Sequence, residues 1–217
     1  MQPWFGFAHP VSSLLHIAGA IIFSYLAFFL LKRETTSTGD MISLAIFAFS
    51  CIFLLLVSSI YHYLHNTANT YLVFQRLDHA AIFLVIAGSF TPLHYINFSG
   101  FFRWGILGIV WFFALAGLIV KTLFFNVIPE WFGLAFYLGM GWIGIITGFL
   151  LWRKYGFLFI TPLWLGGFFY TLGGLIEYRR EPIIIPGIVG AHEILHLSVL
   201  FGIGLHWWFV IKTLKQS

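Results

Sequence analysis

Seven long apolar stretches constrain this 217-residue chain more than any other feature of its sequence. Each has roughly 20 residues, the length that an α-helix needs to cross the hydrocarbon core of a bilayer. Lipid offers no partners to backbone groups, so such stretches cross as helices. The chain is 60% hydrophobic and 8% charged, more apolar than a soluble domain of this size. We therefore predict an all-α integral membrane protein, with one domain over residues 1–217 and transmembrane helices at about 10–31, 41–65, 72–95, 101–124, 130–152, 157–176 and 190–211.

The lone cysteine, Cys51, excludes intrachain disulfides and thiolate metal cages. The segment before the first apolar stretch lacks the Lys/Arg-rich region of a cleavable signal, so we expect the first span to be retained. The net charge of +4 comes from basic residues that flank the spans. There they act as topology signals and headgroup contacts, so we expect no nucleic-acid partner.

Basic residues divide unequally between the two ends of the spans. The end that carries the N-terminus has Arg76, Lys121, Arg179 and Arg180. The opposite end has Lys32, Arg33, Arg103, Arg153, Lys154, Lys212 and Lys215. By the positive-inside rule, this bias favours an N-terminus outside and a C-terminus in the cytoplasm.

The histidines follow a stronger bias toward one end. His94 and His206 lie toward the C-terminal end of the bundle, whereas the other seven lie toward the end that carries the N-terminus, namely His9, His16, His62, His65, His79, His192 and His196. Asp78 and Glu193 belong to the same half. Ionisable groups are costly in lipid, so this gathering predicts a polar cavity that opens toward the N-terminal end.

Two of these histidines have the spacing of metal ligands. His192 and His196 are four residues apart in the last span, about 40° apart around a helix, so they share one face. His62 in the second span could bring a third imidazole, with His65 as its rival one turn closer to the aqueous end. Three imidazoles hold catalytic Zn²⁺ and leave its fourth position to water.

Asp78 and Ser58 are the candidate catalytic residues. Asp78 lies near the same depth on the third span, where it could accept or orient the proton of a water molecule. Ser58 shares a helix face with His62 and could donate to a developing oxyanion. These roles predict metal-assisted hydrolysis of a lipid amide or ester. The structural alternatives are an ion pair of Asp78 with Arg76 or His79, and a Ser58 hydroxyl bonded to its own helix.

The segment His192-Glu193-Ile-Leu-His196 also matches His-Glu-x-x-His, the pattern of zinc metalloproteases in which Glu is the general base. The third ligand of a metzincin is missing, because His206 lies about 15 Å further along the helix. Glu193 is rotated by about 100° from His192, which favours an interhelical contact over a role as base. We expect His16 and His79 to line the cavity or support the ligands.

Four segments, in order along the chain, resemble the haemolysin III family: Ser58-Ser-Ile-Tyr-His62, Arg76-Leu-Asp-His-Ala-Ala-Ile82, Ala87-Gly-Ser-Phe-Thr-Pro92 and His192-Glu-Ile-Leu-His196. This family is the bacterial branch of the progestin and adipoQ receptor superfamily, which includes the adiponectin receptors and is distantly similar to alkaline ceramidases. The resemblance implies a seven-helix protein of the bacterial inner membrane. It also implies zinc on His62, His192 and His196, with Ser58 and Asp78 beside the metal-bound water.

The first span departs from the family pattern. Leu14-Leu-His-Ile-Ala-Gly19 resembles the family's Thr-His-x-x-Gly, but Leu15 replaces the threonine. The acidic and asparagine positions that usually precede it are absent from Phe5-Gly-Phe-Ala-His-Pro-Val-Ser-Ser13.

A zinc-dependent lipid hydrolase is the function that the sequence favours, with a membrane lipid as its substrate. A lipid-sensing receptor or membrane-homeostasis protein with a structural zinc is the alternative. A pore-forming cytolysin and an intramembrane metalloprotease rank below both. Fold kinship alone does not choose among them.

Overall fold

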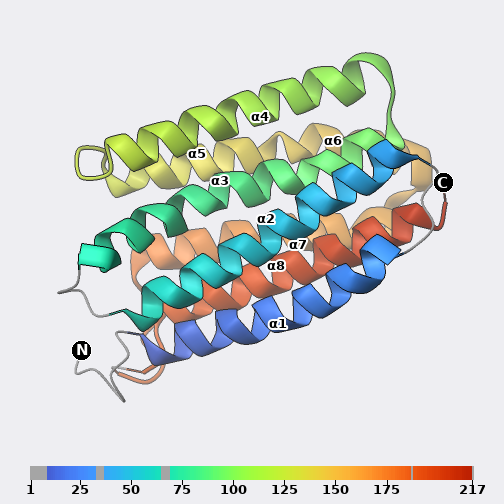
Figure 1. Cartoon of the computed structure of the whole chain (residues 1–217). Helices are drawn as coiled ribbons and strands as arrows, with labels where there is room; N and C mark the ends of the chain where they lie inside the picture. Colours follow the sequence, from blue (N-terminus) through green and yellow to red (C-terminus); the bar gives the residue numbers. More distant parts are fainter. Residues whose placement is uncertain (1–8, 33–36, 65–68, 187, 217) are drawn as a thin grey trace.

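Long antiparallel helices make up the computed structural model of the chain, which describes residues 9–32, 37–64, 69–186 and 188–216 (Figure 1). The helices are α1 Pro10–Lys32, α2 Thr38–Tyr63, α3 Asn69–Asn97, α4 Gly100–Leu123, α5 Glu130–Trp142, α6 Gly144–Tyr155, α7 Phe157–Arg179 and α8 Ala191–Leu214. Within these described ranges there is no β-strand, and the only bridge joins Ile185 to Val189.

Seven of these segments are long and apolar enough to cross a membrane, when α5 and α6 are taken as the single segment Glu130–Tyr155. Their ends lie within three residues of the predicted spans, apart from the second span, whose predicted end at residue 65 lies outside the described residues. The prediction of an all-α protein with seven spans is confirmed.

The fifth span differs from its prediction because the helix breaks at Ile143. The amide of Ile143 donates to the carbonyl of Met140, three residues back, at 3.2 Å. Glycines surround the break at positions 139, 141 and 144, and glycine holds a helix less firmly than any residue except proline. A local tightening of the backbone at these glycines therefore divides the span into α5 and α6.

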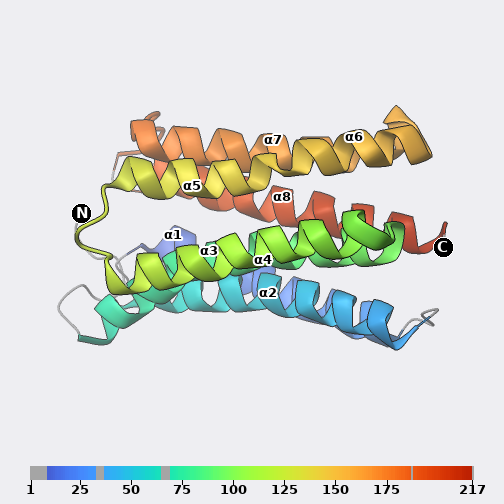
Figure 2. The same ribbon diagram turned by 90° about the horizontal axis from the view of Figure 1, so that it is seen from above.

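The packing order of the helices brings the first and last helices together. Along the sequence, α1 packs on α2, α2 on α3 and α3 on α4, while α7 packs on α8. α8 also contacts α1 and α3, which closes the bundle (Figures 1 and 2). The beginning of α8 therefore lies beside the end of α2.

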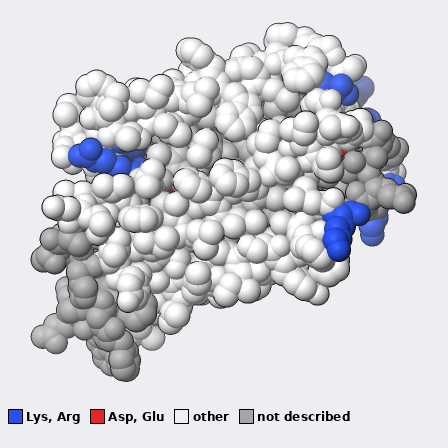
Figure 3. All heavy atoms as spheres, viewed as in Figure 1, with Lys and Arg blue, Asp and Glu red and all other residues white. Residues whose placement is uncertain are grey.

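The outer surface is apolar along most of its length. Large side chains such as Ile21, Phe112 and Trp208 are more than half exposed, whereas Phe47 and Ile203 are fully buried in the interior. Figure 3 shows Lys and Arg only toward the two ends of the face in view. A continuous apolar belt between charged ends is the surface expected of a chain that spans a bilayer.

Glycines let α7 and α8 approach closely. A methyl carbon added at Gly166 would lie 2.3 Å from Cδ2 of His206, and one at Gly173 would lie 2.7 Å from Cβ of Ser198. The neighbouring Gly167 has nothing within 4 Å of that position. Small residues at such contacts allow the close van der Waals packing that holds helices together in lipid.

We expect Gly166→Ala to lower the free energy of unfolding by about 1–3 kcal/mol, because the added methyl group overpacks the contact with α8. Gly167→Ala is the matched control, since its methyl group meets open space and alanine favours a helix. Titration of the purified protein with a denaturing detergent measures both. Equal stability of the two variants would contradict the close contact at Gly166.

Candidate metal centre

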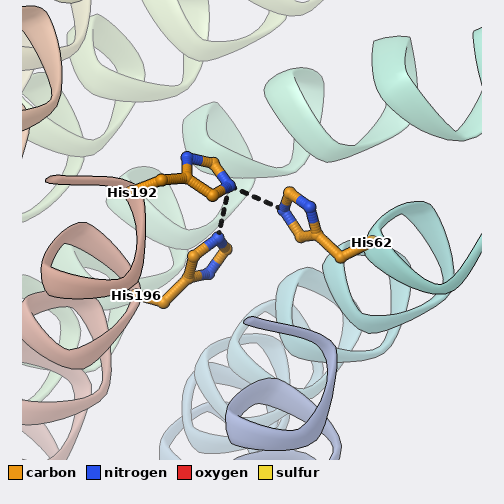
Figure 4. Close-up of side chains that lie close together, drawn as sticks. All are labelled: His62, His192 and His196. Atoms are coloured by element: carbon orange, nitrogen blue, oxygen red, sulfur yellow. Dashed lines mark hydrogen bonds between the residues drawn. The ribbon is translucent and has the colours of Figure 1, made fainter. Parts of the chain in front are cut away.

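The three predicted ligands meet at one end of the bundle. His62 comes from the last turn of α2, and His192 and His196 come from the first two turns of α8 (Figure 4). Nε2 of His192 lies 3.3 Å from Nε2 of His62 and 3.0 Å from Nε2 of His196. Each residue offers one nitrogen within 4.8 Å of the other two, so the triad could hold a metal ion.

The imidazole rings touch one another instead of lining open space. Ring centroids within the triad are 4.5–4.7 Å apart, and the rings meet mainly edge to face. His62 and His196 are 2% and 4% exposed, whereas the side chain of His192 is 31% exposed. The predicted gathering of polar groups is therefore a compact cluster that is open beside His192.

Glu193 stabilises the start of α8 beside the triad. Its Oε2 accepts a hydrogen bond from the amide of Gly190 at 2.9 Å, which caps the first turn of the helix. Its Oε1 accepts from the hydroxyl of Ser12 at 3.2 Å, which ties α8 to α1. The carboxylate of the protease-like pattern thus makes the interhelical contact expected of it, and it fixes the turn that carries His192.

Glu177 at the end of α7 orients His192. Its Oε1 lies 3.1 Å from Nδ1 of His192. A carboxylate can only accept, so Nδ1 donates, and Nε2 of a neutral His192 then presents its lone pair toward the other two ligands. This role was not predicted from the sequence. Its available signal was a carboxylate in the last turn of an apolar span, at the end where the histidines gather.

His16 and His9 complete the cluster from the N-terminal side. Nε2 of His16 lies 2.8 Å from Nδ1 of His196, so His16 supports a ligand as expected. The ring of His9 lies 5.5 Å from that of His62, and the His9 amide donates to the His62 carbonyl. Burial lowers the pKa of His9 below its usual range, and the nearby His192 lowers that pKa further.

The structure also brings Ser58 and Asp78 together. Ser58 is 1% exposed on α2, and its side chain lies close enough to the carboxyl group of Asp78 on α3 to interact with it. Asp78 and His192 are close enough to interact electrostatically. In the part of the chain that the structure describes, ion pairs join Arg180 to Glu130 and His192 to Glu177, and neither includes Asp78.

In the described ranges, the remaining histidines make no hydrogen bond or ring contact with the triad. The ring of His79 packs against Phe125 on the neighbouring loop, at a centroid distance of 5.1 Å. His94 contacts Thr147, and His206 lies near the carbonyl of Leu163, both toward the opposite end of the bundle. The rival ligand His65 and the basic residue Arg33 lie outside the described residues.

We expect the purified wild-type protein to carry a metal ion, and His62→Ala, His192→Ala and His196→Ala each to lose most of it, because two imidazoles hold an ion far less firmly than three. Elemental analysis of the purified variants measures this loss. His206→Ala is the control on the same helix, since His206 lies near the carbonyl of Leu163 toward the opposite end of the bundle. Full metal content in any of the three alanine variants would remove that residue from the ligand set.

We expect Glu177→Gln to weaken metal binding by about 10- to 100-fold, because a neutral amide orients and polarises His192 less strongly than a carboxylate does. Competition with a chromogenic chelator gives the dissociation constant. Glu130→Gln is the matched control, as Glu130 lies at the same end and pairs with exposed Arg180. Unchanged affinity in Glu177→Gln would show that the contact with His192 is incidental.

Comparisons with known proteins identify the family of this chain. The family model described as "Haemolysin-III related" matches residues 8–207. The chain is 30% identical over 207 residues to "Hemolysin-3" of Bacillus cereus, and the match covers 94% of this chain and 87% of the relative. It is 31% identical over 168 residues to "Hemolysin-3 homolog" of Bacillus subtilis (strain 168), and the match covers 76% of this chain and 74% of that relative. The family predicted from four motifs is confirmed, and this chain belongs to the haemolysin III family.

Proposed function

We propose that this protein is a zinc-dependent hydrolase that cleaves an amide or ester bond near the headgroup of a membrane lipid. The observation that carries the proposal is the spacing of the three Nε2 atoms. Zn–N bonds of about 2.0–2.1 Å in a tetrahedron separate two ligand nitrogens by about 3.3 Å. Nε2 of His192 lies 3.0 and 3.3 Å from the Nε2 atoms of His196 and His62, close to that value, and the ligand atoms of all three residues lie within 4.8 Å of one another.

The donor set supports zinc over harder cations. Imidazole nitrogens suit zinc and its transition-metal neighbours, whereas magnesium and calcium prefer oxygen. A zinc ion held by three protein ligands would supply Lewis-acid polarisation of a carbonyl and acidification of a water molecule. Side chains next to the triad would carry out the remaining steps, which are proton transfers and positioning.

Asp78 is the proposed general base. As the oxygen of a water molecule attacks the carbonyl carbon, Asp78 takes its proton, and that proton passes to the amine or alcohol when the C–N or C–O bond breaks. The side chain of Ser58 interacts with Asp78, which supports a role in holding the carboxyl group in place. Its predicted donation to an oxyanion remains part of the proposal.

The location of the triad supports a lipid substrate. It lies near the aqueous end of the spans, in the last turn of α2 and the first turns of α8. The amide and ester bonds of lipids lie at that depth, between the headgroup and the acyl chains. The orientation that we favour from the charge bias places this end on the outer side of a bacterial inner membrane.

A receptor with a structural metal is the second candidate, and His9 is the observation that favours it. Its ring lies 5.4 Å from that of His192, so a small movement would offer a fourth imidazole. Four protein ligands make a closed site, which is typical of structural zinc. His9→Ala separates the two functions, because a hydrolase keeps its metal in this variant and a closed site loses part of its affinity.

We expect Asp78→Asn to lower kcat by about 10²–10⁴-fold and to leave the zinc content unchanged, because it removes a proton acceptor and no ligand. The assay follows release of fatty acid from matched amide-linked and ester-linked lipids in nanodiscs. Ser58→Ala should lower kcat less. Glu193→Gln should retain wild-type turnover, because the amide can still bond to Gly190 and Ser12 and so keep the turn that carries His192. The proposal fails if Asp78→Asn remains active, or if zinc-loaded wild type turns over neither lipid class.

A further inference from the structure

A second feature, unrelated to the metal centre, lies toward the other end of the bundle. It is a groove of about 500 Å³ between α2 and α4, with α3 as its floor. α2 and α4 both pack against α3, which lies between them in Figure 1. The residues that define the groove are Gly39, Ile46, Thr91, Tyr95, Trp104 and Trp111.

The groove has the dimensions of part of an acyl chain. From Gly39 to Ile46 and from Trp104 to Trp111, its two walls each run seven residues, or about 10 Å at the rise of an α-helix. One leaflet of hydrocarbon is about 15 Å thick, half of the bilayer core. Gly108 keeps the α4 wall open, because nothing lies within 4 Å of the position where a Cβ would stand.

The polar groups that line the groove do not need a polar ligand. The hydroxyl of Ser43 donates to the carbonyl of Asp40, and that of Thr91 donates to the carbonyl of Ala87. Nε1 of Trp111 donates in turn to Oγ1 of Thr91. The polar atoms of these lining residues are thus satisfied inside the protein, which leaves an apolar trough suited to a hydrocarbon chain.

Arg103 places a positive charge at one end of this trough. Its Cζ lies 4.8 Å from the ring centroid of Tyr95, and the Tyr95 ring also meets that of Trp104. Nε of Arg103 donates to the carbonyl of Phe98 at 2.6 Å, which holds the side chain in position. Neither of the ion pairs among the described residues includes Arg103.

The surrounding end of the bundle is basic. In the described part of the chain, six cationic residues lie there, and Asp40, which is buried, is the acidic residue at that end. Figure 3 shows this concentration of Lys and Arg on the face in view. The six are Lys32, Arg103, Arg153, Lys154, Lys212 and Lys215.

We propose that the groove between α2 and α4 binds an anionic glycerophospholipid, with one acyl chain along α3 and the headgroup phosphate on the guanidinium of Arg103. Guanidinium groups bind phosphate through paired, charge-assisted hydrogen bonds. Tyr95 and Trp104 flank the phosphate at headgroup depth, where such aromatic side chains are enriched. Asp78 and Tyr95 lie 17 residues apart on α3, about 25 Å, so this site is separate from the metal centre.

Native mass spectrometry of the delipidated full chain tests the site, with phosphatidylglycerol and phosphatidylcholine of identical acyl chains as probes. We expect phosphatidylglycerol to bind about fivefold more tightly, the preference that one basic residue supplies near a membrane surface. Arg103→Gln should remove the preference, and Arg103→Lys should keep most of it. Arg153→Gln, an exposed residue at the same end, is the control that should keep it fully.

Gly108→Leu tests the acyl chain independently of the charge, because its side chain fills the open wall of the groove. We expect this variant to retain less of both lipids. Equal lipid binding by wild type and Arg103→Gln would overturn the headgroup contact. If Arg153→Gln lost the preference for phosphatidylglycerol as fully as Arg103→Gln, the preference would come from diffuse attraction to the basic end and the contact with Arg103 would be overturned. Displacement of the lipid by inorganic phosphate alone, or unchanged retention in Gly108→Leu, would overturn the acyl site.

Discussion

The absence of water from the hydrocarbon core determines where every polar group of this chain can stand. Ser50, Thr91 and Thr122 satisfy their hydroxyls within their own helices, by donating to carbonyls three or four residues back. A histidine cannot satisfy two ring nitrogens in this way, so it must find partners on other helices. Histidines from α1, α2 and α8 therefore gather at one place, and that gathering is the candidate metal centre.

The same constraint gives the opposite end of the bundle a different character. There, Nε2 of His94 bonds to Thr147, while Asn97 accepts from Lys154 and Tyr155. These bonds join α3 to α6 and satisfy the polar groups pairwise, without several ring nitrogens facing one point. The two ends are thus both polar, but only the end near the N-terminus among the described residues has a set of converging metal donors.

Most of the fold and part of the candidate site could be predicted from sequence patterns. Length and apolarity locate the spans, because the bilayer sets a minimum for each, and the four-residue spacing of His192 and His196 places both on one face. The break at Ile143 was not predicted, since glycines within an apolar run give no periodic signal. Nor was Glu177, because its contact with His192 depends on the register of α7 against α8, which close glycine contacts determine in three dimensions.

That register links the packing of the helices to the chemistry of the site. The carboxylate of Glu177 accepts from Nδ1 of His192, and Glu193 fixes the turn on which His192 lies. The direction of the Nε2 lone pair is therefore set by the protein, so little conformational freedom remains to be lost when a ligand binds. The ring of His196 is restrained in the same manner, because its Nδ1 lies 2.8 Å from Nε2 of His16. The triad is accordingly a preorganised donor set, and its geometry is a property of the helix packing itself.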